Sequence, residues 1–244
     1  MFNQSTGPLA NTPTVVKNLV IINALFFLVK SLGNGMFMGQ HMDTLLGLHY
    51  ISSPDFRPWQ LVTHMFMHGG FWHLFMNMFG LFMLGSPLEY RWGSKRFLTF
   101  YGICGIGAGL LYLGVQAFDY NALMAQLSPE QVAQVRLQGR DYLFNNDAMN
   151  GLARLYFVDL VGASGAIFGL LVAFGMLYPN VELMIFPLPI PIKAKYFVLL
   201  YGGYELYAGL ANHSGDNVAH FAHIGGLVVG FITVMIWRKR LPYM

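Results

Sequence analysis

The chain has 244 residues, of which 55% are hydrophobic, 16% aromatic and only 10% charged. So few charged side chains cannot cover a soluble globule, and the same composition excludes intrinsic disorder and argues against a nucleic-acid binder. The single cysteine, Cys104, permits neither an internal disulfide nor a zinc site made of thiolates. We therefore expect an integral membrane protein that packs in lipid.

Six predominantly apolar stretches follow one another, each near the ~20 residues that a helix needs to cross a ~30 Å hydrocarbon layer. Their approximate bounds are 14–32, 71–87, 97–117, 160–179, 196–212 and 217–237. Their hydrophobicity is continuous rather than alternating, which favours helices over strands, and an open sheet cannot satisfy its backbone in lipid. The sequence predicts an all-α membrane protein, a six-transmembrane helical bundle in which residues 1–244 form one domain.

The basic residues are unevenly divided between the two sides of this alternating topology. One side carries Lys17, Arg91, Lys95, Arg96, Lys193, Lys195, Arg238, Lys239 and Arg240. The opposite side is mostly acidic. The positive-inside rule therefore predicts that both termini are cytoplasmic.

Two long segments, about 37–70 and 118–159, are expected to be loops on the outer side. The first is apolar for a loop, which favours a position in the membrane interface. The second is polar, and Ser128-Pro129-Glu130 predicts the start of a short helix, with an N-cap, a proline in the first turn and an acid at the positive end. Residues 181–192 carry prolines at alternate positions and should be extended.

Polar side chains inside spans are costly in lipid, so each one is a candidate functional residue. His73 and Asn77 lie four residues apart on one face of the second span, Ser164 opens the fourth, and the sixth contains His220 and His223. The helical rise places Ser164 and His223 at a similar depth, ~8–10 Å below the outer boundary. A hydroxyl and an imidazole at one level are the minimum for a serine nucleophile.

Small residues at four-residue spacing form a stripe on each of the spans that carry Ser164 and His223. The stripes are Gly165, Gly169 and Ala173 in the fourth span, and Ala222, Gly226 and Gly230 in the sixth. Such stripes allow helix backbones to approach closely in lipid. A serine in a transmembrane helix usually serves packing alone. Here the flanking Gly162 and the donors His73 and Asn77, which could stabilise an oxyanion together with the Ser164 backbone N–H, favour a nucleophile.

Four motifs in chain order resemble those of the rhomboid family of intramembrane serine proteases, in its bacterial six-span basic form. They are the series His64, His68, His73 and Asn77; Glu89-Tyr90-Arg91; Gly162-Ala163-Ser164-Gly165; and Ala222-His223 followed by Gly226 and Gly230. The resemblance covers about 59–230. Where the family often has Trp-Arg in the first outer loop, this sequence has Trp59-Gln60, and its 118–159 segment is long.

The resemblance implies a Ser-His dyad without an acid: Ser164 as nucleophile and His223 as general base and then general acid. It places His73, Asn77 and the Ser164 backbone in the oxyanion hole. It implies supporting roles for the residues around them: Gly162, Gly165, His68 and Phe168, with Phe168 either against the base or filling the core. No cofactor or metal is expected. Transmembrane protein substrates, a bacterial inner membrane and a site opening to its outer side are expected.

Two other classes of function remain open at this point. A rhomboid-like pseudoprotease would bind membrane helices without cutting them, although both members of the dyad are retained here. A histidine-rich membrane metalloenzyme would use a cluster of imidazoles: His64, His68, His73, His220 and His223. Glu205, the only acid inside a span, is expected to bond a neighbouring tyrosine or to lie near the cytoplasmic water layer rather than to orient a histidine.

Overall fold

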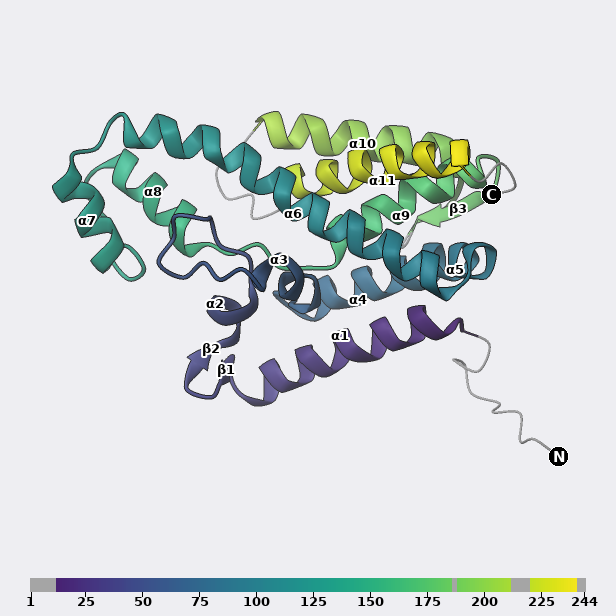
Figure 1. Cartoon of the computed structure of the whole chain (residues 1–244), viewed down its shortest axis with the longest axis horizontal. Coiled ribbons are helices and arrows are strands. Elements are labelled where there is room, and N and C mark those ends of the chain that lie inside the picture. Colours follow the sequence, from purple (N-terminus) through teal and green to yellow (C-terminus); the bar gives the residue numbers. More distant parts are fainter. Residues whose placement is uncertain (1–11, 186–187, 212–219, 241–244) are drawn as a thin grey trace.

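Long helices run side by side in the computed structural model, which describes residues 12–185, 188–211 and 220–240 (Figure 1). The main ones are α1 (Thr14–Leu32), α6 (Ser94–Met124), α9 (Ser164–Leu177), α10 (Ala194–Ala211) and α11 (His220–Arg240). Within the described residues, three helices are long and apolar enough to cross a membrane: Thr14–Leu32, Ser94–Met124 and His220–Lys239. The protein is therefore a mostly helical membrane protein in which the described part of the chain contains three clear apolar spans, and α9 is a shorter apolar helix.

Some of these helices have the expected bounds, and others are longer, shorter or divided. Helix α1 coincides with 14–32, whereas α6 extends beyond 97–117 at both ends and α9 begins four residues after 160. The expected 71–87 stretch consists of α4 (Phe71–Gly80), a π-helical turn η2 (Leu81–Gly85) and α5 (Ser86–Trp92). Residue 212 and residues 217–219 of the last two expected spans lie outside the described residues.

The two expected outer loops contain short elements that pack together at one end of the bundle (Figure 1). The first loop starts with β1 (Met36–Phe37), one residue before the expected 37–70 segment, paired with β2 (Gln40–His41). It continues with α2 (Met42–Leu46), α3 (Gln60–Thr63) and a 3-10 turn η1 (His64–Phe66). The 118–159 segment holds α7 (Pro129–Gln138) and α8 (Asp147–Phe157). Helix α7 starts at the predicted point, where Ser128 and Gln131 form a capping box.

The structure is mostly helical as predicted, but it is not all-α. Besides the short β1–β2 pair, β3 (Glu182–Ile185) and β4 (Leu188–Lys193) form an antiparallel hairpin. The expected extended segment 181–192 is thus paired rather than isolated; residues 186 and 187 lie outside the described residues. Prolines at alternate positions place their missing N–H groups on one edge of a strand. The other edge keeps its donors and can pair, as Ile192 does opposite Leu183.

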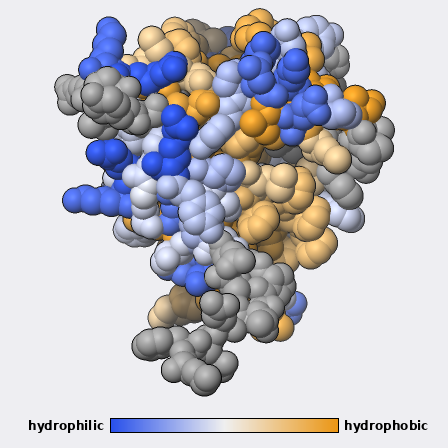
Figure 2. Space-filling view, turned by 90° about the vertical axis from the view of Figure 1, so that its right-hand side faces the viewer, coloured by the Kyte–Doolittle hydropathy of each residue, from blue (hydrophilic) through white to orange (hydrophobic). Residues whose placement is uncertain are grey.

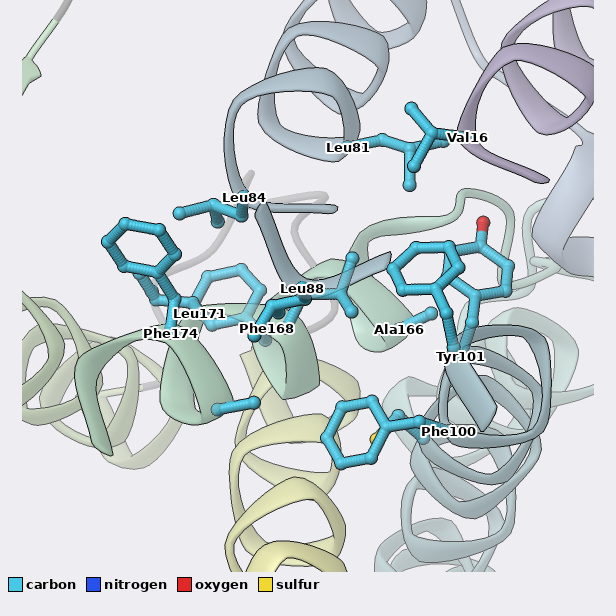
Figure 3. Packing of buried hydrophobic residues seen from close by; sticks show 14 of the residues in the cluster. Val16, Leu81, Leu84, Leu88, Phe100, Tyr101, Ala166, Phe168, Leu171 and Phe174 are labelled. Atoms are coloured by element: carbon cyan, nitrogen blue, oxygen red, sulfur yellow. The ribbon is translucent and has the colours of Figure 1, made fainter. Parts of the chain in front are cut away.

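The main hydrophobic core lies between α1, the η2–α5 segment, α6 and α9, and Figure 3 shows side chains from these elements meeting. Its labelled members are Val16, Leu81, Leu84, Leu88, Phe100, Tyr101, Ala166, Phe168, Leu171 and Phe174. By contrast, large apolar side chains on the outer faces of α1 and α10, such as Leu28 and Leu199, are exposed. This outward apolar surface suits contact with lipid.

The start of α1 and the end of α11 lie at the same end of the bundle (Figure 1). Figure 2 views this end directly and shows hydrophilic side chains gathered over part of it, beside a hydrophobic area. Exposed basic residues of α5, α6, β4 and α11 belong to the elements that meet there: Arg91, Lys95, Arg96, Lys193, Arg238 and Lys239. The charge asymmetry seen in the sequence thus corresponds to one physical end of the molecule.

The buried carboxylate of Glu89 fixes the start of α1 against α5. Its Oε1 and Oε2 accept the backbone N–H groups of Val15 and Val16 at 2.9 and 2.8 Å, and Oε1 also accepts the Ser94 hydroxyl at 2.6 Å. Helix α1 has no N-cap side chain of its own after Pro13. Glu89 therefore takes the place of an N-cap residue, although it belongs to α5. The positive end of the α1 dipole stabilises the negative charge of its carboxylate.

We expect Glu89→Gln to lower the free energy of unfolding by about 1–3 kcal/mol, because the amide loses charge-assisted hydrogen bonds. Equilibrium unfolding in mixed micelles measures the change. Glu182→Gln, at an exposed acid of β3, is the matched control and should have little effect. Equal losses in the two variants would contradict the capping role.

Candidate active site

Ser164 is the first residue of α9, and the chain reaches it through a turn that only glycine fits. Gly162 has a φ of +124°, a backbone region that other residues rarely adopt. Its N–H donates to the carbonyl of His64 at 2.9 Å. A Cβ on Gly162 would lie 2.8 Å from His73 Nε2 and 3.5 Å from Ser164 Oγ. The glycine thus lets His73 and Ser164 face the same small space.

His223, one turn into α11, lies directly against Ser164. Its Nε2 is 2.9 Å from Ser164 Oγ, a hydrogen-bond distance across two helices. The ring of Phe168, one turn after Ser164, stacks on the imidazole with centroids 4.3 Å apart and planes 13° apart. Both interpretations of Phe168 hold, because the ring stacks on the histidine and also belongs to the main hydrophobic core.

Contact between the backbones of α9 and α11 sets this spacing. A Cβ on Gly226 would collide with the carbonyl of Gly165, and one on Gly230 would lie 2.7 Å from the Cα of Gly169. The two glycine stripes therefore lie face to face. Helix α6 closes the third side, since a Cβ on Gly165 would also meet Ala108 at 2.5 Å.

Backbone contacts define the hydrogen-bonding state of His73. The Gly69 N–H donates to its Nδ1 at 3.3 Å, so in the neutral ring the proton lies on Nε2. That nitrogen faces the space beside Gly162 and Ser164. Asn77 is buried, and its Nδ2 donates to the His73 carbonyl at 2.8 Å, which leaves a second amide N–H for another acceptor.

The other two histidines of the series support the loop. His64 Nδ1 donates to the carbonyl of Gln60 at 2.8 Å. His68 is buried, its ring meets that of His73 edge-on at 5.1 Å, and its carbonyl accepts from Lys30 Nζ at 3.1 Å. Lys30 also pairs with Asp43 at 2.6 Å, which ties the end of α1 to this segment.

Gln60, where the family often has arginine, occupies the interior of the outer segment. It is fully buried, and its side chain accepts the N–H groups of His49 and Arg57 and donates to the carbonyls of Thr44 and Asp55. Four hydrogen bonds satisfy a neutral amide, whereas a buried guanidinium would need a counter-charge. Gln60 thus links four backbone groups of the outer segment from its buried position.

Glu205 is a residue whose contacts differ from those expected from the sequence. Its Oε2 lies 2.9 Å from His223 Nδ1 and 2.6 Å from His220 Nδ1, and its side chain is 2% exposed. The carboxylate therefore contacts histidines rather than the cytoplasmic water layer, and the expectation of a tyrosine partner was wrong. The sequence did contain a signal for these contacts: an acid inside one expected span, followed by two histidines in the next span. A charge in lipid needs hydrogen-bond donors, and the histidines can supply them.

The cluster of potential metal ligands differs from the one the metalloenzyme alternative requires. Among the described residues, one trio brings its ligand atoms within 4.8 Å of one another, namely Glu205, His220 and His223. His64 and His68 are not part of it, and His64 has its Nδ1 committed to a backbone carbonyl. Within the described segments, the five histidines do not come together as one metal centre.

These features define a helical membrane protein in which a serine and a histidine meet between neighbouring helices. A family model described as Rhomboid domain matches residues 55–240. The chain therefore belongs to the rhomboid family.

Curated relatives from different organisms are similar to this chain. Rhomboid protein 1, mitochondrial, of Saccharomyces cerevisiae is 28% identical over 80% of this chain and 45% of its own. RHOMBOID-like protein 12, mitochondrial, of Arabidopsis thaliana is 29% identical over 92% and 59%. Rhomboid protease AarA of Providencia stuartii is 28% identical over 70% and 53%. The chain thus spans about half the length of these relatives, which include mitochondrial and bacterial proteins.

We expect Gly226→Ala to separate α9 from α11 and to lower the free energy of unfolding by about 1–3 kcal/mol, because its methyl group would overlap the Gly165 carbonyl. Gly203→Ala is the matched control, since a Cβ there meets nothing within 4 Å and alanine favours helix. Unfolding in mixed micelles compares the two. Similar stability of the two variants would contradict the close-contact interpretation.

A second expectation concerns pH and the loop histidine His64. Burial lowers the pKa of His64 to about 4, whereas an unfolded histidine titrates near 6.5. On acidification the unfolded chain therefore binds the proton first, and stability should fall as the pH drops from about 6.5 to about 4. Thermal midpoints across this range should fall less steeply in His64→Gln. An unchanged slope would contradict a buried neutral imidazole.

Proposed function

We propose that this protein is an intramembrane serine endopeptidase that cleaves transmembrane segments of other membrane proteins through a Ser164–His223 dyad. The observation that carries the proposal is the 2.9 Å distance between His223 Nε2 and Ser164 Oγ. Family membership supports it, as does a relative named as a rhomboid protease.

In the proposed reaction, Ser164 Oγ attacks a peptide carbonyl while His223 Nε2 takes its proton. The carbonyl oxygen becomes an oxyanion, which the Ser164 N–H at the start of α9, the His73 Nε2–H and an Asn77 amide N–H would stabilise. His223 then gives the proton to the leaving amine as the C–N bond breaks. Water then attacks the ester carbonyl while His223 takes a proton from the water. His223 returns this proton to Ser164 Oγ as the ester C–O bond breaks, which releases the second product.

The substrate must expose a peptide bond that a helix normally shields. Cleavage should therefore favour segments that unwind near the cut, which means small or helix-weakening residues there. The polar side chains around Ser164 would provide the route for water from the outer side.

We also propose the six-span arrangement, with α4–α5, α9 and α10 crossing the membrane together with α1, α6 and α11. Both termini would then be cytoplasmic, in a bacterial inner membrane, with Ser164 near the outer face. The basic residues at the end shared by α1 and α11 support this orientation.

The test is cleavage of a single-span model substrate by the protein reconstituted in lipid vesicles. Ser164→Ala and His223→Ala should each lower kcat by at least about 10³-fold with folding intact, because nucleophile and base act as a unit. A fluorophosphonate should label Ser164 in the wild type but not in His223→Ala.

Two outcomes would remove the proposal. Cleavage by Ser164→Ala at the wild-type rate would show that another group attacks the substrate. Binding of the model substrate without cleavage by any variant, wild type included, would favour the pseudoprotease.

A further inference from the structure

The hydrogen bond between Ser164 and His223 continues to a third side chain. Glu205 Oε2 lies 2.9 Å from His223 Nδ1, the ring nitrogen that does not face Ser164. Glu205 belongs to α10 and His223 to α11, two helices that lie next to each other (Figure 1). Three neighbouring helices thus contribute one continuous series of hydroxyl, imidazole and carboxylate.

We propose that Glu205 is a positioning residue for His223, so that the site works as a Ser-His-Glu arrangement rather than a bare dyad. This inference rests on the proposed protease function. It assigns the carboxylate no contact with the substrate, and its effect is transmitted through the imidazole.

The carboxylate selects the tautomer that a general base needs. An ionised carboxylate only accepts hydrogen bonds, so His223 Nδ1 must carry a proton toward Glu205. In the neutral ring, Nε2 then has the lone pair and accepts the Ser164 hydroxyl. Without an acceptor at Nδ1, the proton could occupy Nε2, and the imidazole could not take the serine proton.

His220 holds the carboxylate in place. Its Nδ1 lies 2.6 Å from the same Oε2, so the oxygen lies between two imidazole donors. These donors offset part of the desolvation cost of a side chain that is 2% exposed. The oxygen is thereby fixed relative to α11, and with it the plane of the His223 ring, which Phe168 holds from the other direction.

The surroundings of Glu205 on its own helix support a directed role. Among the described residues of α10, the buried ones are Ala194, Glu205 and Ala208. Its neighbours Tyr204 and Leu206 are exposed. The one charged side chain of this trio is thus turned inward, toward the histidines, on a helix that otherwise buries small residues.

Glu205, His220 and His223 could in principle hold a metal ion. The distances between their ligand atoms argue against it. Zinc bonds of ~2.0 Å in a tetrahedral geometry keep ligand atoms ~3.3 Å apart. The two Glu205–histidine distances are 2.6 and 2.9 Å, which are hydrogen-bond distances. The experiment below includes a chelator, which would reveal a metal site at Glu205.

The experiment compares Glu205→Gln, Glu205→Asp and the wild type in lipid vesicles with a single-span model substrate. E205Q should lower kcat at least about tenfold, since loss of the acid partner costs up to ~10⁴-fold in a soluble serine protease. KM should stay within about twofold, because no contact with the substrate is lost. The rate of Ser164 labelling by a fluorophosphonate should fall in parallel. E205D keeps a carboxylate and should recover part of kcat over E205Q.

The matched control is Glu89→Gln, which removes a buried carboxylate whose hydrogen-bond partners are Val15, Val16 and Ser94. It should lower the thermal midpoint while kcat of the folded protein stays unchanged. The proposal is overturned if E205Q keeps kcat within about twofold of the wild type, if E205D is no faster than E205Q, or if KM alone changes. EDTA abolishing wild-type turnover, with recovery on adding zinc, would overturn it in favour of a metal site. These results are distinct from full cleavage by Ser164→Ala, which would instead remove the protease function.

Discussion

The close contact between α9 and α11 sets the geometry of the whole candidate site. Lipid offers no hydrophobic driving force between helices, so van der Waals contact and interhelical hydrogen bonds must hold them. Gly165 faces Gly226 without any intervening side chain, and that proximity brings Ser164 within 2.9 Å of His223. Helix α6 fixes the pair from a third direction, with Ala108 against Gly165. A bulkier residue in either stripe would move the hydroxyl away from the imidazole.

The outer segment is part of this constraint rather than a covering loop. The carbonyl of His64 accepts the Gly162 N–H just before α9, while its ring donates to the carbonyl of Gln60. Gln60 in turn satisfies its buried amide entirely within the loop. A continuous set of hydrogen bonds therefore runs from the interior of the loop to the turn before Ser164, and it fixes the direction from which α9 begins. His64 therefore has a structural role, apart from the catalytic role proposed for His73.

The sequence predicted the elements whose signals are local. The proline and cap at Ser128 marked the start of α7, and four-residue spacing identified the glycine stripes on the helices of Ser164 and His223. The hairpin after α9 and the direction of Glu205 depend on pairing between segments, which periodicity does not encode. Helix α10 is apolar on nearly all sides, so its pattern gives no preferred inner face. The partner of Glu205 could be inferred only from the rule that a buried charge requires donors.

Burial makes the contact between Glu205 and His223 more consequential than the same contact in water. A carboxylate removed from solvent is costly, and two imidazole donors offset only part of that cost while His223 is neutral. In the proposed reaction, where His223 would take the serine proton, the contact would become an ion pair at 2.9 Å in surroundings of low dielectric. The interaction would then be stronger in the transition state than in the resting state, and only such a difference accelerates a reaction. The buried Glu205 carboxylate would thus stabilise the positive charge that His223 acquires during the proposed attack by Ser164.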